Sequence, residues 1–314
     1  MPESANAVAA VRLAGYQGRG SILTQALCHL GQALQMADSA LTVDVQDDVT
    51  AGGEKAAELF SSIERGERQI GYMASGYLSS RVPELAVLDL PFSIDDRAAA
   101  LQALDGPAGT LLREAVARDS GFQVLGFWDN GFRHISNARR PLRTPADCAG
   151  LVIRTLDSAA YRDSLAALGF EAVTLDVKDL VSAVASGAVD AQENPLTNLI
   201  GFGLWRHHPH VSLTGHCFGL LLLVCPRAWF DALPAAQRSG LERAAAEATA
   251  LQRQLAREQD AAALTALRGH GVQVLGPNEI DLPAMREATA VVRARLRQQL
   301  PQALLDAYLP QGLH

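Results

Sequence analysis

The sequence is short of lysine, of aromatic residues and of any excess of positive charge. Of its 314 residues, 27 are basic and 34 are acidic, which gives a formal net charge of −7; only Lys55 and Lys178 are lysines, and aromatic residues make up 5%. Nucleic-acid binders need clustered positive charge to neutralise phosphates, and no basic block stands out here. The composition therefore argues against a nucleic-acid partner.

Cysteine is also scarce, with four residues: Cys28, Cys148, Cys217 and Cys225. No two of them form a CxxC pair, and none has a histidine partner at zinc-ligand spacing. A disulfide scaffold needs a higher density of cysteine in a shorter chain. We expect buried, apolar cysteines and no metal site, while a local disulfide between Cys217 and Cys225, which flank one apolar run, remains open.

Long hydrophobic runs are missing. The longest apolar run, residues 218–225, spans eight residues, whereas a membrane-spanning helix needs about 20. The N-terminus, residues 1–7, has neither the basic region nor the apolar core of a signal peptide. We expect no membrane span. Two explanations of the N-terminus remain open, a cytoplasmic protein or a chain whose signal peptide was removed.

The common enzyme signatures are absent as well. A dinucleotide-binding GxGxxG pattern fails because Leu23 stands where the third glycine belongs, and the chain has no P-loop and no HExxH motif. Ser75 lacks the first glycine of a GxSxG nucleophile motif. The only histidine cluster, residues 207–210, contains Pro209, which prevents helical presentation of metal ligands. We therefore expect no catalytic residues and no cofactor.

What the sequence does contain is the pattern of an α/β protein. Apolar residues make up 48% and charged residues 19%, which supplies a core, and the length suggests about two domains. Strands at 11–15, 41–46 and 69–73 alternate with helices at 21–34 and 54–65, which is typical of a parallel sheet with crossover helices. Further elements are expected over residues 95–104 (helix), 107–118 (helix), 122–127 (strand), 151–154 (strand), 158–168 (helix), 178–186 (helix), 189–192 (strand), 216–224 (strand), 235–268 (helix), 272–275 (strand) and 282–308 (helix). A second α/β unit begins near residue 126, so we predict two lobes with a ligand cleft between them.

Strong hydrogen-bonding groups follow or end three of these strands. Arg133 lies beyond the strand 122–127, Arg154 ends the strand 151–154, and Asn194 follows the short strand near 189. In open α/β sheets ligands bind beyond the carboxyl ends of strands. A guanidinium is planar, always charged and able to hold a carboxylate through two hydrogen bonds, and Asn194 can add an amide donor. The pattern predicts a site for an organic acid.

These motifs resemble a known family. The segments that carry the likeness are Trp-Asp-Asn-Gly-Phe-Arg-His-Ile-Ser-Asn (128–137), Gly-Leu-Val-Ile-Arg (150–154), Gly-Ala-Val-Asp-Ala-Gln-Glu-Asn-Pro (187–195) and Val-Pro-Glu-Leu-Ala-Val-Leu-Asp-Leu-Pro-Phe (82–92). Together they resemble the solute-binding proteins of TRAP transporters, the DctP-type family. The similarity extends over about residues 10–235.

The resemblance implies a periplasmic binding protein that delivers an organic acid to TRAP membrane permease subunits. It implies two α/β lobes with strands that cross between them, together with a long hinge-spanning helix that fits the stretch 235–268. It also implies that Arg154 forms the main ion pair with the ligand carboxylate, assisted by Arg133 and Asn194. The resemblance favours a removed signal peptide and a periplasmic location, and we expect a monomer.

Five further residues are candidate ligand contacts on position alone: Tyr16, Gln17, Ser75, Trp128 and Phe170.

The approximate lobe boundaries are 10–125 with 216–250 for the first lobe, and 126–215 with 251–308 for the second. Two other functions remain open at this stage, a sensory ligand-binding module of the same fold and a two-domain α/β enzyme. Which organic acid binds does not follow from these motifs.

Overall fold

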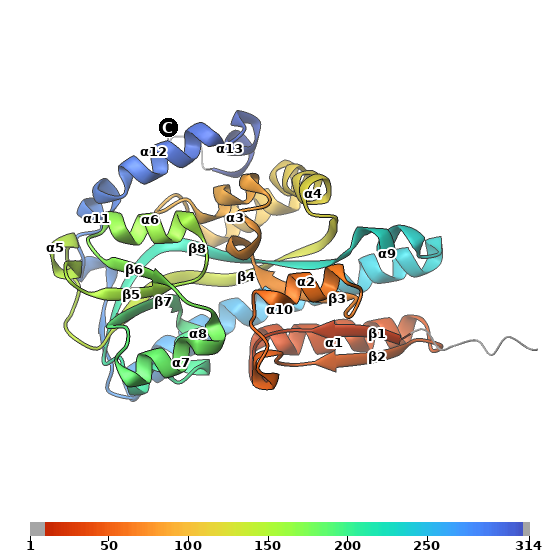
Figure 1. Cartoon of the computed structure of the whole chain (residues 1–314), viewed down its shortest axis with the longest axis horizontal. Coiled ribbons are helices and arrows are strands. Elements are labelled where there is room, and N and C mark those ends of the chain that lie inside the picture. The colour runs from red at the N-terminus through yellow and green to blue at the C-terminus, as the bar shows by residue number, and fades with distance from the viewer. Residues whose placement is uncertain (1–9, 310–314) are drawn as a thin grey trace, which may run out of the picture.

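Residues 10–309 are described by a computed structural model, and they form one mixed sheet covered by helices (Figure 1). Within these residues the sheet has nine strands in the order β2-β1-β3-β8-β4-β7-β5-β6, with β9 paired to β8. The strands are β1 (Ala10–Ala14), β2 (Thr42–Gln46), β3 (Ile70–Ala74), β4 (Phe122–Asn137), β5 (Val152–Thr155), β6 (Glu171–Thr174), β7 (Ala191–Pro195), β8 (His210–Pro226) and β9 (Gln273–Leu275).

In the view of Figure 1, helices lie above and below the strands of this sheet. They are α1 (Ile22–Ala37), α2 (Glu58–Glu64), α3 (Arg97–Asp105), α4 (Pro107–Asp119), α5 (Pro145–Cys148), α6 (Ala159–Ala167), α7 (Val177–Ser186), α8 (Leu196–Gly201), α9 (Arg227–Ala232), α10 (Ala235–Gly269), α11 (Leu282–Ala288), α12 (Ala290–Gln299) and α13 (Gln302–Tyr308), with short 3₁₀ turns between some of them. No helix in the range 10–309 is long and apolar enough to cross a membrane.

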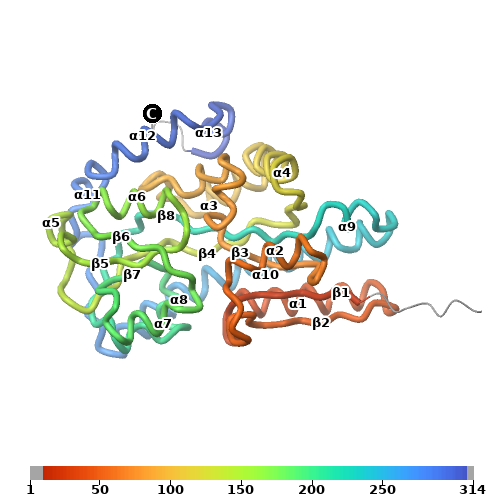
Figure 2. The backbone as a smooth tube through the Cα atoms, viewed as in Figure 1, coloured from red at the N-terminus to blue at the C-terminus, as the bar shows by residue number. Residues whose placement is uncertain are grey.

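Two long strands join the halves of the molecule. β4 and β8 pair antiparallel along most of their length. One end of β8 pairs with β3 through residues 221–224, and one end of β4 pairs with β7 through residues 133–137. Beyond them, β1 is parallel to β2 and β3, and β5 is parallel to β6 and β7. The two parallel units expected from the sequence are therefore present, and β4 and β8 cross from one to the other (Figure 2).

The length of β4 corrects an expectation. The strand was expected to end at residue 127, but it continues to Asn137. The register shifts where Gly126 and Gly131 fall, and Gly131 has a φ of 89°, a conformation that other residues rarely adopt. These irregularities interrupt the period-2 pattern that marks a strand in a sequence. Trp128 and Arg133 consequently lie inside a strand rather than after one.

Most of the expected helices form where the apolar spacing predicts them. α1 begins after Ser21, whose hydroxyl accepts a hydrogen bond from the Thr24 N–H at 3.1 Å, and its apolar face is buried. α10 runs over 35 residues and contacts α1, β4 and α8, so it touches both halves of the sheet. The single helix expected over 282–308 is divided into three, in part because Pro301 cannot continue a helix. β6 was not expected at all.

The apolar core consists of one large buried cluster and three smaller ones. One large buried cluster packs around α1, β1, β3, α4 and the adjoining parts of β4 and β8. Smaller clusters pack around β5, β7 and α6, around α8 and the end of α10, and around α7. The large cluster also includes Ala160 and Tyr161 of α6 and residues of α12 and α13, so it extends beyond the β1–β3 end of the sheet.

All four cysteines are free. Cys217 and Cys225 both lie on β8, eight residues apart in an extended strand. At about 3.3 Å per residue they are roughly 25 Å apart, far beyond the reach of a disulfide. The local pairing left open by the sequence is therefore excluded.

Candidate ligand-binding site

The structure contains a small cavity, which is called the cavity from here on. It lies where β1, β3, β4, β5, β7 and α8 approach one another. Its volume is about 20 Å³, which suffices for about one water molecule. The residues that line it are Tyr16, Ala74, Tyr77, Asn130, Arg133, Arg154, Leu156, Val177, Asn194, Asn198 and Phe202. The three residues that carried the sequence argument, Arg133, Arg154 and Asn194, are thus brought together at one point.

Arg154 is buried with part of its guanidinium unpaired. Its side chain leaves β5, and Nε donates to the Leu175 carbonyl oxygen at 2.8 Å. Only 2% of the residue is exposed, and Nη2 has no hydrogen-bond partner within the described chain. Burial lowers the pKa of Arg154, because a charge removed from water without a full set of partners is costly. An anion in the cavity would supply the missing partner.

Arg133 differs because a resident carboxylate already neutralises it. Its Nε and Nη2 donate to the two carboxylate oxygens of Glu193, with 2.9 Å from Nη2 to Oε1. Thr155 Oγ1 donates to the same Oε1 at 2.8 Å, and His216 Nε2 lies 3.5 Å from Oε2. Although burial alone would raise it, the charge of Arg133 and the nearby His216 lower the pKa of Glu193 to about 2. Glu193 is therefore ionised, and Arg133 brings little net charge to the cavity.

Asn194 lines the cavity, and neighbouring side chains hold its amide. Its Nδ2 donates to Gln192 Oε1 at 2.6 Å, while its Oδ1 accepts from Asn198 Nδ2 at 3.0 Å. Arg133 Nη2 lies 3.4 Å from the same Oδ1, and a guanidinium can only donate. One of the two N–H groups of the Asn194 amide is thus used by Gln192, and the role of Asn194 as an amide donor to a ligand stays a prediction.

A larger groove adjoins the cavity and shares Asn130, Asn198 and Phe202 with it. Its volume is about 450 Å³, in the range typical of small-molecule sites. Gln17 Nε2 donates to Asn198 Oδ1 at 3.2 Å, which connects the loop after β1 to α8 between the two spaces.

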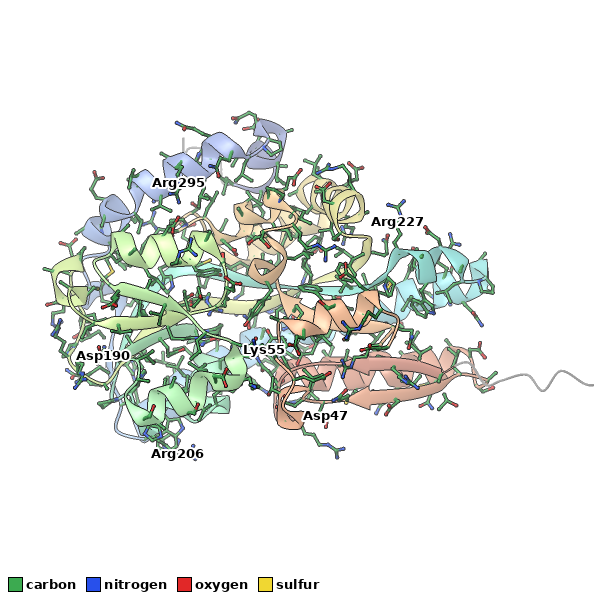
Figure 3. The ribbon with its side chains drawn as sticks, viewed as in Figure 1. Asp47, Lys55, Asp190, Arg206, Arg227 and Arg295 are labelled. Atoms are coloured by element: carbon green, nitrogen blue, oxygen red, sulfur yellow. The ribbon has the colours of Figure 1, made fainter. Side chains whose placement is uncertain are left out.

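A second set of contacts connects the same two halves, and we call it the latch. The Asp176 carboxylate, which caps α7, accepts hydrogen bonds from the backbone N–H groups of Ala56 and Ala57, both at 3.1 Å. Lys178 Nζ donates to the Gly53 carbonyl oxygen at 3.4 Å. Figure 3 shows Lys55, the residue before Ala56, near the middle of the molecule. The latch thus holds the segment before α2 against the start of α7.

The five candidates chosen on position alone divide into two groups. Tyr16 lines the cavity and Gln17 lines the groove. Ser75, Trp128 and Phe170 line neither space.

Each of those three is buried elsewhere. Trp128 is fully buried in the large core cluster, where its Nε1 donates to Thr249 Oγ1 at 3.1 Å. Phe170 packs in the core around β5. Ser75 lies beside the buried Asp89. Trp128 is in the core because β4 continues past it instead of ending before it.

Several lining residues were missed. Asn198 lies four residues after Asn194, and Tyr77 lies in a 3₁₀ turn (Ser75–Leu78) after β3. Glu193 stands within the Gln-Glu-Asn-Pro motif, yet its pairing with Arg133 depends on the register of β4 against β7. The four-residue spacing of the two asparagines was the one sequence signal that could have identified Asn198.

Comparison with known proteins gives a consistent family assignment. Residues 13–299 match the family described as bacterial extracellular solute-binding protein, family 7 (DctP). A solute-binding protein of Verminephrobacter eiseniae is 33% identical over 251 residues, covering 79% of this chain and 73% of that protein. The 2,3-diketo-L-gulonate-binding periplasmic protein YiaO of Escherichia coli K12 is 29% identical over 81% of this chain and 76% of its own length.

A solved structure agrees with this assignment. The sugar acid binding protein DctPAm of Advenella mimigardefordensis, crystallised in complex with galactonate, superposes with a TM-score of 0.89. It is 25% identical to this chain, and the match covers 95% of this chain and 97% of that one. The two-lobe α/β fold is shared.

Proposed function

Because the chain belongs to the bacterial extracellular solute-binding proteins of family 7, we propose that it captures a small organic acid and delivers it to a TRAP membrane permease. Proteins of this family are transport binding proteins, not enzymes. The observation that carries the ligand assignment is the buried Arg154 guanidinium, whose Nη2 has no partner within residues 10–309. A carboxylate can accept two hydrogen bonds from such a group and neutralise its charge.

The cavity supports the same proposal by its chemistry. Arg154 binds the ligand carboxylate, and the ion pair of Arg133 with Glu193 provides a fixed polar surface beside it. Tyr16 and Tyr77 also line the cavity, and Tyr77 lies close to Arg154. A cavity of about 20 Å³ is too small for an organic acid. We therefore propose that the ligand enters an open form and that the lobes then close around it.

We propose that closure occurs between the two lobes defined above, 10–125 with 216–250 and 126–215 with 251–308. The contacts of Gln17 with Asn198 and of Asp176 with Ala56 and Ala57 cross from the first lobe to the second. We further propose that the protein acts in the periplasm, as a monomer, with the closed form recognised by the permease. The names of two relatives, which specify a diketo-gulonate and a galactonate complex, favour an acid of this general kind.

Native mass spectrometry and a thermal-shift screen test the proposal. Protein purified without denaturation should carry a small acid, and the screen should give stabilisation by organic acids only. A ligand at about 100 times its Kd adds about 2.7 kcal/mol to the free energy of unfolding. Stabilisation by neutral sugars or amines as strong as that by acids would contradict the carboxylate assignment.

A further inference from the structure

One edge of β4 lacks a strand partner over much of its length. β8 pairs with β4 from Phe122 to Asn137, whereas β7 pairs with the opposite edge only from Arg133 to Asn137. Among the described strands no other pairs with β4, so this edge is without a strand neighbour over residues 122–132. Its buried backbone N–H and C=O groups need other partners, because an unpaired buried backbone group is costly.

Two side chains of α10 bond to this edge. Gln252, which is fully buried, accepts a hydrogen bond from the Asp129 backbone N–H at 2.8 Å, and its Nε2 donates to the Asp129 carbonyl oxygen at 2.6 Å. Arg253 Nε donates to the Phe127 carbonyl oxygen at 3.1 Å. A residue in a hydrogen-bonded pair of antiparallel strands makes the same two bonds, one through its N–H and one through its C=O. Gln252 therefore takes the place of a strand neighbour and fixes the backbone of Asp129.

The residue after Asp129 forms a β-bulge. Asp129 and Gly131 lie opposite consecutive residues of β8, 220 and 219, so Asn130 is the extra residue without a partner in that strand. Gly131, with its φ of 89°, donates its N–H to Asp129 Oδ1 at 2.8 Å. The Asp129 carboxylate thus bridges the bulge, while Gln252 holds the Asp129 backbone. The position of Asn130 consequently depends on how Asp129 is held.

Asn130 extends from this bulge to the ligand site. It lines both the cavity and the groove, and 7% of the residue is exposed. Within residues 10–309 its side-chain amide makes no hydrogen bond, although an amide offers two N–H donors and a carbonyl acceptor. Buried polar groups normally have partners. A molecule bound in the cavity or the groove is in position to supply them.

Gln252 lines neither the cavity nor the groove, so it has no direct contact with a molecule bound there. From these contacts we infer that Gln252 is a positioning residue of the ligand site: it holds the backbone of Asp129 and thereby sets where the Asn130 amide meets the ligand. The inference rests on the proposed function and deepens it, because it connects the ligand to α10, the helix that contacts both halves of the sheet.

Calorimetry on single and double variants tests the inference. The probes are galactonate, gluconate, lactate, pyruvate and succinate, and the acid among them that binds the unsubstituted protein most tightly is used throughout. Asn130→Ala should weaken its binding about 3- to 10-fold, the effect of one or two neutral hydrogen bonds. Gln252→Met has a side chain of similar length that cannot make either bond to Asp129. It should weaken binding by a similar factor, because Asn130 is no longer held in place.

The double variant Asn130→Ala/Gln252→Met separates positioning from a general effect on the fold. If Gln252 acts through Asn130, Gln252→Met should change the Kd by less than about twofold once residue 130 is alanine. An effect that does not pass through Asn130 would be the same in both backgrounds, since independent effects add. Circular dichroism and melting curves check that each variant folds. If Gln252→Met does not fold, Gln252→Asn, whose side chain is one methylene group shorter and cannot reach both backbone atoms, enters the same cycle.

Thr249→Val is the matched control. Thr249 lies on α10 nearly one turn before Gln252, and its Oγ1 accepts from Trp128 Nε1 at 3.1 Å, so the variant also breaks a buried bond between α10 and β4. Thr249 lines neither the cavity nor the groove. The variant should lower the melting temperature, as Gln252→Met does, and leave the Kd unchanged.

The possible outcomes distinguish this inference from the proposed function. The positioning role is wrong, while the organic-acid function stands, if Gln252→Met weakens binding equally with and without Asn130, or if Thr249→Val weakens binding as much as Gln252→Met does. The same holds if Asn130→Ala and Gln252→Met both bind the acid as tightly as the unsubstituted protein. If none of the probe acids binds the unsubstituted protein, both proposals fail.

Discussion

The two walls of the cavity differ in charge. Tyr16, Ala74 and Tyr77, from the end of β3 and the turns after β1 and β3, carry no ionised group, whereas Arg133 and Arg154, from β4 and β5, carry the buried charges. In the closure proposed above, a ligand anion binds first to the charged wall, and the uncharged wall then excludes water and strengthens the ion pair.

The two arginines of the charged wall differ in a second way. Arg133 is held by Glu193 within the protein, while Arg154 has an unpaired Nη2. The ion pair of Arg133 with Glu193 is complete within the protein, whereas we propose that Arg154 is neutralised by the ligand. Two substitutions test this division between folding and binding, and two more test a buried acid and the latch.

The largest expected effect is on binding, in Arg154→Ala. Removing one member of a buried ion pair costs about 3–5 kcal/mol, which corresponds to roughly two to four decades of affinity for the cognate acid. Circular dichroism should show a folded protein, and Arg154→Lys should also bind poorly because an ammonium cannot form the two parallel hydrogen bonds. Arg227→Ala, on an exposed ion pair of α9 (Figure 3), is the matched control. A loss of less than fivefold in calorimetry would remove Arg154 from the centre of the site.

Glu193→Ala should act mainly on stability. It leaves Arg133 buried without a carboxylate, and breaking such a pair costs about 3–5 kcal/mol of the free energy of unfolding. Denaturant titration measures this loss, with Asp231→Ala on the exposed pair with Arg227 as the control. Unfolding curves for Glu193→Ala that superpose on those of the unsubstituted protein would show that the pair does not stabilise the fold.

The dependence of stability on pH should reveal the buried Asp89. Burial raises the pKa of Asp89 to about 7, against an ordinary value near 4, and Ser158 Oγ donates to its Oδ2 at 3.1 Å. Because the folded state binds the proton more tightly, the contribution of Asp89 is largest below pH 4 and falls as the pH rises to 7. The loss amounts to a few kcal/mol at most. Melting curves of Asp89→Asn between pH 4 and 8 should lack this decline, and curves parallel to those of the unsubstituted protein would contradict the assignment.

The smallest expected effect comes from the latch, in Asp176→Ala. Loss of the α7 cap and of the hydrogen bonds from Ala56 and Ala57 should cost about 1–2 kcal/mol. Because those bonds form only when the lobes are together, apparent affinity should fall several-fold and small-angle scattering should show a larger radius of gyration. Asp96→Ala removes a comparable cap from α3 without touching the latch, and should change stability alone. Equal affinities in the two variants would show that the latch does not favour closure.

Sequence reasoning located the charged wall better than the uncharged one. Arg154 and Arg133 could be identified from the sequence because an arginine in or near an apolar strand is unusual. The motifs that surround them are also specific. Trp128 was misplaced because the bulges at Gly126 and Gly131 hide the continuation of β4.

Other contacts depend on long-range register. The pairing of Arg133 with Glu193 follows from the alignment of β4 with β7, and no local pattern in the chain encodes that alignment. Tyr77 and Asn198 come from a 3₁₀ turn and a short helix, where strand periodicity gives no signal. The fold class and the meeting of Arg133, Arg154 and Asn194 at one cavity could therefore be predicted, while Tyr77 and Asn198 could not.

The most direct test of the account compares one bound acid with its own primary amide by calorimetry, in the unsubstituted protein and in Arg154→Ala. The amide has the shape of the acid without its charge. We expect the amide to bind about 100-fold or more weakly than the acid in the unsubstituted protein, and the difference between them to disappear in Arg154→Ala. Equal affinities for acid and amide in the unsubstituted protein would contradict the carboxylate role of Arg154.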